Sequence, residues 1–246
     1  MATNVPMAPT VRVLVWDVPV RVFHWLLVAA FAGVFLTAES ERLRLTHVQL
    51  GYTMVGLVLF RSIWGLVGSP YARFASFVTG PSAVWRYLRS VPTATPEHHV
   101  GHNPAGAAAM VGLMALTLVA GVTGWLGYEG LAGDWILEVH EAAAGAMMAL
   151  VGLHVAGVML ASLRHRENLI GAMVTGWKRG PMPTAQVRRH RLVGVVLMVA
   201  VGGYWALWGG MPASTDSALG RLGQLVPRLA DQAPRTEVTG MVVAER

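Results

Sequence analysis

Five long runs of apolar residues limit what this chain can fold into. They cover residues 22–38, 45–67, 104–126, 139–163 and 192–208. A helix needs about 20 mostly apolar residues to cross the hydrocarbon core of a bilayer, and each run approaches that length. With 54% hydrophobic and only 13% charged residues, the composition also departs from that of ordinary soluble domains. The sequence predicts an all-α membrane protein: a bundle of four transmembrane helices, a fifth transmembrane helix and a short carboxyl-terminal tail.

The same runs predict how the chain is divided. Residues 1–180 are expected to form the main transmembrane domain, residues 181–210 an additional transmembrane helix, and residues 211–246 a tail outside the membrane. In this tail, leucine and valine recur at helical spacing between Pro212 and Pro234. The segment could be an amphipathic helix at the membrane surface or one that binds a partner, and a poorly ordered end is an equal alternative.

Two local signals add detail to this arrangement. Asp17 as a cap, with Pro19 close behind, predicts the start of the first helix. Residues 70–96, which include "SPYARF" and "WRYL", predict an amphipathic stretch on the inner membrane surface.

The positive charges indicate orientation. A net charge of +6 could suggest nucleic acid, but the chain has no basic module interleaved with aromatic residues, so no nucleic-acid partner is expected. Basic residues gather before the first run, between the second and third, and after the fourth, whereas the loop after the third carries Glu129, Asp134 and Glu138 without Lys or Arg. The positive-inside rule therefore predicts a cytoplasmic amino terminus and a tail on the opposite side.

The acidic loop has two interpretations. Together with Glu141, its carboxylates could attract a cationic redox partner such as a c-type cytochrome. Acidic side chains are, however, favourable at a helix amino terminus in any case.

Histidines inside the apolar runs are the main functional signal. His140 and His154 lie fourteen residues apart in the fourth run, which places them on one helix face about 21 Å apart along the axis. His24 lies at the inner beginning of the first run and His47 at the outer beginning of the second. In an antiparallel bundle, His24 can therefore face His154 near the inner surface, and His47 can face His140 near the outer one. Ionisable groups at such depths are functional candidates.

Two histidines at each depth suit haem better than a bare metal ion. The chain has no cysteine, which excludes thiolate ligands and covalent haem attachment. Structural zinc usually takes four protein ligands, whereas haem iron needs only two axial ones. Gly51, four residues after His47, could let a flat ring approach the backbone, and close helix packing is the alternative role for such glycines. A single histidine of this kind is more often a packing or interfacial residue than a ligand, and the functional interpretation rests on four of them at matched depths.

The motifs around these histidines resemble a known family. "WDVPVRVFHW", "HVQLGY", "EVHEAAA" and "LHVAGV" look like the bacterial cytochrome b561 family, which includes the b-type cytochrome subunit of nickel–iron hydrogenases. The resemblance covers roughly residues 15–178, and a fifth helix and tail extend beyond the usual four helices. It implies two haem b groups with bis-histidine ligation, His24 with His154 and His47 with His140, in a multi-pass protein of the bacterial inner membrane.

The resemblance also implies a function. We expect electron transfer through two haems between the quinone pool, with ubiquinone as the candidate quinone, and a redox partner such as a periplasmic c-type cytochrome or a hydrogenase. Membrane lipid would surround the bundle. One alternative is a quinone-linked superoxide oxidase. Another, of a different class, is a haem-free membrane anchor or small transporter whose histidines bind protons or a metal ion. Whether the chain itself is an enzyme stays open, and the sequence supports no catalytic residue.

Several arginines and the other histidines could support haem or quinone binding or lie at the protein surface. Arg21, Arg42, Arg44 and Arg61 could pair with haem propionates, although such residues more often anchor helix ends. His102, in "GHNP", could lie beside a quinone or the inner haem. Surface or interfacial positions are expected for the other four histidines, which are His98, His99, His165 and His190.

Overall fold

The computed structural model describes residues 11–93, 99–180 and 188–209. The chain forms two compact units, residues 1–199 and 200–246. The first unit contains nearly all of the described elements, and the described part of the second is the end of one apolar helix. The predicted tail helix and His98 lie outside the described residues.

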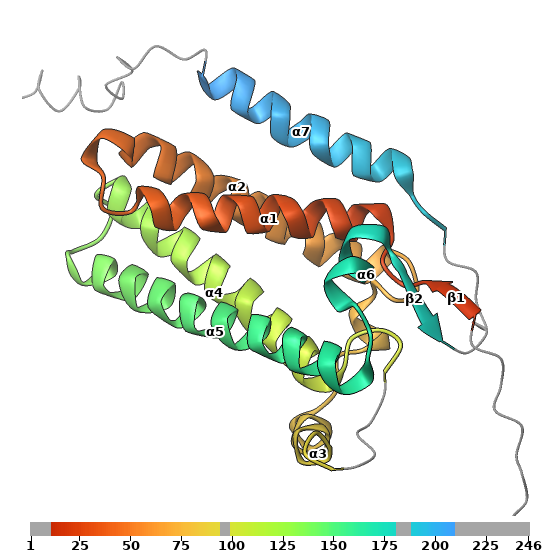
Figure 1. The fold of residues 1–246 in the computed structure, drawn as a ribbon. Helices are drawn as coiled ribbons and strands as arrows, with labels where there is room; N and C mark the ends of the chain where they lie inside the picture. Colours follow the sequence, from red (N-terminus) through yellow and green to blue (C-terminus); the bar gives the residue numbers. More distant parts are fainter. Residues whose placement is uncertain (1–10, 94–98, 181–187, 210–246) are drawn as a thin grey trace, which may run out of the picture. The chain divides into compact units, whose positions relative to one another are not determined.

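Four long helices form the transmembrane part that the sequence predicts. They are α1 (Val18–Thr37), α2 (Arg44–Val67), α4 (Pro104–Tyr128) and α5 (Trp135–His165). All four are long and apolar enough to cross a membrane. In Figure 1 they run side by side with alternating direction; α1 packs on α2, α2 on α4, and α4 on α5.

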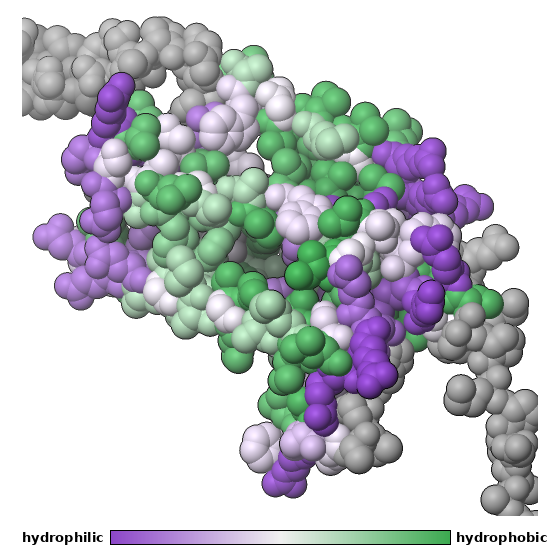
Figure 2. Space-filling model, in the orientation of Figure 1, coloured by the Kyte–Doolittle hydropathy of each residue, from purple (hydrophilic) through white to green (hydrophobic). Residues whose placement is uncertain are grey.

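Apolar side chains cover the outside of these helices. Leu36 in α1 is 82% exposed and Leu163 in α5 is 77% exposed, as expected where lipid and not water surrounds a helix. Figure 2 shows hydrophobic side chains along the middle of the bundle and hydrophilic ones gathered toward its two ends. This distribution supports the predicted membrane protein.

The first helix begins as predicted. Asp17 is the amino-terminal cap of α1, and its Oδ1 accepts a hydrogen bond of 3.1 Å from the Val20 amide. Its Oδ2 accepts a second bond of 3.0 Å from the Trp64 indole nitrogen in α2. Because Asp17 is only 1% exposed, both bonds compensate for removing the carboxylate from water, and they tie α1 to α2 at one end.

A small sheet, which the sequence analysis did not predict, lies at that same end. Strand β1 (Val11–Leu14) pairs antiparallel with β2 (Trp177–Gly180). Between the short helix α6 (Leu169–Thr175) and β2, Gly176 adopts a φ of +90°, a region that glycine enters at little cost. Its carbonyl accepts bonds from the amides of Val15, at 2.9 Å, and Trp16, at 3.1 Å.

The expected amphipathic stretch contains a single helix. Helix α3 (Pro81–Ser90) follows a short 3₁₀ turn, η2 (Phe74–Ser76), and is seen end-on in Figure 1, so it runs across the direction of the long helices. Its apolar Trp85 and Leu88 are about half exposed. This agrees with a helix that lies on the membrane surface.

The predicted fifth apolar segment also forms a helix. Helix α7 (Arg191–Gly209) is 19 residues long, close to the minimum needed to cross a bilayer. Its crossing of the membrane stays a prediction. A second short 3₁₀ turn, η1 (Glu41–Leu43), precedes α2 and completes the described elements.

Candidate functional site

The structure brings His47 and His140 face to face across the bundle. His47 lies in the first turn of α2 and His140 in the second turn of α5. Their ring centroids are 6.2 Å apart with an angle of 68° between the planes. Two imidazoles that each bind one metal atom at about 2.0 Å would have centroids roughly 6 Å apart. The spacing therefore fits two axial ligands of a single metal centre, and we call the end of the bundle that carries this pair the outer end.

Hydrogen bonds fix which ring nitrogen of each histidine is available. His47 Nδ1 lies 3.0 Å from the Val34 carbonyl oxygen, and His140 Nδ1 lies 2.8 Å from the Ala120 carbonyl oxygen. A carbonyl can only accept, so each Nδ1 carries the hydrogen and each Nε2 keeps its lone pair. Histidines that bind metals usually donate their other N–H in this way, which orients the ring.

Gly124 makes the Ala120 carbonyl accessible to His140. In a helix the Cα–Cβ bond tilts toward the amino terminus, so a side chain at position 124 would lie over the carbonyl one turn earlier. A Cβ there would come within 3.0 Å of both Cε1 and Nδ1 of His140. Gly124 and the two carbonyl acceptors were not predicted from the sequence, because glycines were considered only beside a flat ring or in close helix packing.

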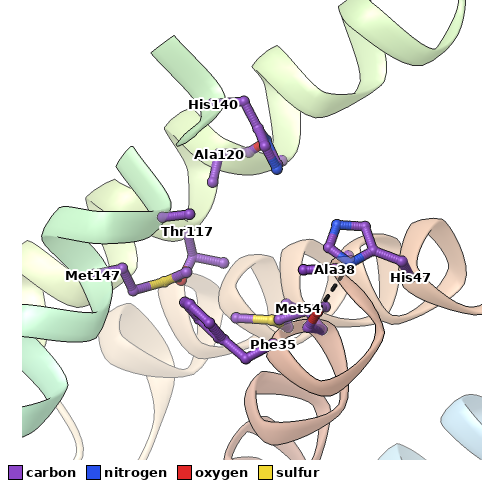
Figure 3. A pocket seen from close by; sticks show the side chains of 12 residues that line it. Phe35, Ala38, His47, Met54, Thr117, Ala120, His140 and Met147 are labelled. Carbon is purple, nitrogen blue, oxygen red and sulfur yellow. Dashed lines mark hydrogen bonds between the residues drawn. The ribbon is translucent and has the colours of Figure 1, made fainter. Parts of the chain in front are cut away.

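A largely apolar pocket surrounds the His47–His140 pair. Figure 3 shows both side chains projecting into the same space, with Phe35, Met54, Thr117 and Met147 near them. The Thr117 hydroxyl already donates to the Leu113 carbonyl at 2.8 Å, so the pocket presents few unsatisfied polar atoms. Its lining consists of Val34, Phe35, Ala38, His47, Gly51, Met54, Thr117, Ala120, Gly121, His140, Ala144 and Met147.

Gly51, which the sequence suggested could lie beside a flat ring, is part of the lining of this pocket. A Cβ built on Gly51 meets no atom within 4 Å, so its lack of a side chain leaves open space instead of allowing close contact between helices. Apolar walls, a gap beside a glycine and two opposed imidazoles fit a flat, largely apolar group that offers two axial positions on its metal. Haem has these properties.

The second predicted pair lies at the opposite end, which we call the inner end. His24 is in the second turn of α1 and His154 is in the carboxyl-terminal half of α5. They are close enough that the charge of His154 acts on His24. His24 Nδ1 is buried without a hydrogen-bond partner, whereas both Nδ1 atoms of the outer pair have one. The two ends of the bundle are therefore built differently.

His102 belongs to the same inner neighbourhood. Its ring lies 4.6 Å from the Trp16 ring and 4.3 Å from the Phe77 ring, measured between centroids. Burial lowers the pKa of His102 from 6.5 to about 3, and the positive charge of Arg61 acts in the same direction, followed by smaller effects of His154, Lys178 and His24. The imidazole is therefore neutral at pH 7.

Arg61 and His99 are more buried than the helix-end and surface positions that the sequence favoured for them. Arg61 is 1% exposed and does not anchor a helix end in water. His99 is partly buried, with a buried Nδ1 that has no partner, and its carbonyl accepts a bond of 3.3 Å from Lys178. Lys178 in turn forms an ion pair of 3.0 Å with Glu167. The buried charged side chains thus concentrate at the inner end.

Within the residues that the structure describes, no three His, Cys, Asp or Glu side chains come together as ligands for a bare metal ion.

Comparison with known proteins gives an independent result. Residues 15–176 match the profile of a family described as prokaryotic cytochrome b561. Several curated relatives are similar at low identity. A probable Ni/Fe-hydrogenase B-type cytochrome subunit of Azotobacter vinelandii is 26% identical over 212 residues, which cover 68% of this chain and 88% of that protein.

Two further relatives carry similar names. A probable Ni/Fe-hydrogenase 1 B-type cytochrome subunit of Escherichia coli strain K12 is 28% identical over 140 residues, 47% of this chain and 60% of that protein. A corresponding subunit of Rhizobium leguminosarum bv. viciae is 23% identical over 209 residues, 67% of this chain and 87% of that protein. No solved structure matches the chain significantly. Because the matched region includes α1, α2, α4 and α5 with their four histidines, this chain is a multi-pass membrane protein that belongs to the prokaryotic cytochrome b561 family, a family of b-type cytochromes that transfer electrons.

Proposed function

We propose that the chain binds two haem b groups and passes electrons from one side of the membrane to the other. His47 and His140 would hold the outer haem, and His24 and His154 the inner one. The observation that carries this proposal is the outer pair, whose ring centroids are 6.2 Å apart and whose Nδ1 atoms both donate to backbone carbonyls. An electrostatic, proton-binding or packing role would not require two neighbouring imidazoles whose Nδ1 atoms are both held by backbone carbonyls beside an apolar pocket.

The protein would contribute ligation, orientation and exclusion of water. When bound, haem b supplies reversible one-electron chemistry at iron. With two histidines as its protein ligands, the iron would favour electron transfer over the binding of oxygen. The carbonyls of Val34 and Ala120 hold the imidazoles at a fixed angle, and Phe35, Met54 and Met147 line the pocket with apolar surface.

The two sites would divide the distance across the membrane. His140 and His154 lie on one face of α5, about 21 Å apart along its axis. Electrons could therefore pass between the two ends without a moving part of the protein. The distribution of basic residues supports a cytoplasmic inner end and an amino terminus on the same side, in a bacterial inner membrane.

A redox protein and a quinone are the proposed partners. The relatives named as hydrogenase cytochrome subunits support a partner of the hydrogenase type, and a c-type cytochrome at the acidic outer loop is the alternative. Glu129 and Asp134 in that loop could raise the association rate of a cationic partner. Pull-down from detergent extracts, followed by identification of the bound chains, would separate these partners.

Pigment analysis tests the central proposal. Purified protein should contain two haems per chain with a low-spin spectrum, and His24→Ala and His47→Ala should each remove one haem. A correctly folded but colourless protein would exclude electron transfer through haem and favour the haem-free anchor or transporter.

A further inference from the structure

The inner end contains buried nitrogen atoms that lack a hydrogen-bond partner. Those on the elements around His102 include Nη1 of Arg61, Nδ1 of His102 and Nδ1 of His24. Leaving a buried donor unsatisfied costs about 1–3 kcal/mol, and more for a charged group. An acceptor that binds among these nitrogens would recover that free energy.

Arg61 lies at the depth of the inner pair. It follows His47 by fourteen residues on α2, the same spacing as His140 and His154 on α5, so it returns to the face of α2 that carries His47 about 21 Å further along the helix. At 1% exposure it is removed from water. The sequence therefore places a guanidinium where α2 faces the inner end of the bundle.

Only part of the Arg61 guanidinium is satisfied. Nη2 donates to the Ala72 carbonyl at 2.9 Å and approaches the Met110 sulfur at 3.8 Å, and the group stacks 4.9 Å from the Phe74 ring centroid. Nη1 has no partner. The charge of Asp17 acts on Arg61, but the two carboxylate oxygens of Asp17 already accept from Val20 and Trp64.

His102 shares an aromatic neighbour with Arg61. The Phe77 ring centroid lies 4.3 Å from the His102 ring centroid and 6.0 Å from the Arg61 Cζ. The positive charge of Arg61 also acts on His102. A neutral imidazole can donate from Nδ1 in one tautomer, so two donors from α2 and from the loop before α4 lie beside one aromatic wall.

We propose that Arg61 and His102 form a binding site for an oxygen acceptor at the inner end, with Arg61 Nη1 and His102 Nδ1 as the donors. The acceptor is an oxygen with partial or full negative charge, which is either a propionate of the inner haem or a carbonyl of a quinone head group. This inference rests on the proposed function, because both acceptors belong to electron transfer. A charge-assisted bond to Arg61 would be the stronger of the two.

Two substitutions test the site. Arg61→Met removes the charge and keeps a side chain of similar length. His102→Phe keeps an aromatic side chain and removes both ring nitrogens. Arg73→Met is the matched control, because Arg73 is exposed and lies in the same loop region. For each purified protein we would measure haem content, the midpoint potential of each haem by spectroelectrochemical titration, and the affinity for ubiquinone-1.

The two sources of the acceptor give different results. If a propionate binds there, Arg61→Met lowers the midpoint potential of one haem, because the carboxylate charge near the iron is no longer neutralised. His102→Phe lowers the same potential by a smaller amount, because it removes only a hydrogen bond to the carboxylate. Ubiquinone-1 affinity is then unchanged in both variants. If a quinone binds there, Arg61→Met weakens ubiquinone-1 binding about tenfold or more, the loss expected for one hydrogen bond to a charged group, while both potentials are unchanged. His102→Phe weakens it about fivefold, the loss expected for one neutral hydrogen bond. Either result supports the site.

Unchanged potentials and unchanged ubiquinone-1 affinity in both variants would overturn the inference. If Arg61→Met does not fold, His102→Phe alone decides in the same way. A wild-type protein without haem would refute the proposed function. A protein with two haems, whose midpoint potentials and ubiquinone-1 affinity are the same in both variants, would refute only this site.

Discussion

The two ends of the bundle hold their histidines in different ways. At the outer end, backbone carbonyls of α1 and α4 satisfy both Nδ1 atoms, and the pocket between the rings is lined mostly by apolar side chains. At the inner end, His24 Nδ1 has no partner, and Arg61, Asp17 and Lys178 are buried nearby. Backbone carbonyls thus orient both histidines of the outer pair, while the inner end keeps buried nitrogen atoms without a hydrogen-bond partner. Two sites with the same ligands can therefore differ in affinity and potential.

Removing one of the proposed histidine ligands should produce the largest difference between the two ends. We expect His140→Ala to lose the outer haem completely and to keep the inner one, because each pair would hold one group independently. Haem content and the reduced-minus-oxidised spectrum measure this. His165→Ala, at the end of the same helix, is the control and should keep both haems. Loss of both haems in His140→Ala would show that the two sites are not independent.

Acidic pH should weaken the inner end. The pKa of His102 is about 3 in the folded protein and about 6.5 in an unfolded chain. Below pH 6.5 the unfolded chain therefore binds a proton that the folded protein does not, and stability falls as pH decreases. At pH 5 the loss amounts to about 2 kcal/mol relative to pH 7.

Thermal unfolding in detergent at pH 7 and pH 5 measures this loss. His102→Phe should reduce the difference between the two midpoints, since the substituted ring does not titrate. An equal difference in both proteins would mean that His102 does not carry the effect.

Gly124→Ala should affect only the outer end. The added Cβ would approach His140 to 3.0 Å and disturb its bond to the Ala120 carbonyl. Loss of such a supporting bond typically lowers metal affinity by about tenfold or more, and haem titration of the apoprotein would measure it. Gly152→Ala in α5 is the matched control, because a Cβ there meets nothing within 4 Å. A similar loss in both variants would contradict a local role for Gly124.

The smallest effect is expected for Thr37→Val. The Thr37 hydroxyl lies 3.5 Å from His47 Nδ1 but donates at 2.7 Å to the Gly33 carbonyl. The Val34 carbonyl is the nearer acceptor for His47, so the substitution should change outer haem affinity less than about twofold. A larger change would show that the hydroxyl, and not the carbonyl, orients His47.

The sequence was sufficient for the bundle and for the outer pair. Apolar runs of transmembrane length identify the long helices because lipid leaves the backbone few other ways to satisfy its hydrogen bonds, and a fourteen-residue spacing fixes a helix face whatever the neighbours are. Asp17 was identifiable as a cap because its bond to Val20 is local.

Other features depend on tertiary contacts that the sequence does not encode locally. The strands β1 and β2 have four residues each, too few for an alternating pattern to be visible. The roles of Ala120 and Val34 lie in their carbonyls, which every residue possesses. The burial of Arg61 follows from packing by Phe74 and Phe77, and an isolated arginine near the end of an apolar run normally predicts an anchor at the surface.

The pairing of β1 with β2 has a consequence for assembly. Val11 pairs with Gly180, so the two-stranded sheet joins a segment made before the four long helices to a segment made after them. It can form only after α5 and α6 have been made. Until then the segment ahead of α1 has no strand to pair with, so this end of the protein is completed only after the four long helices have been made.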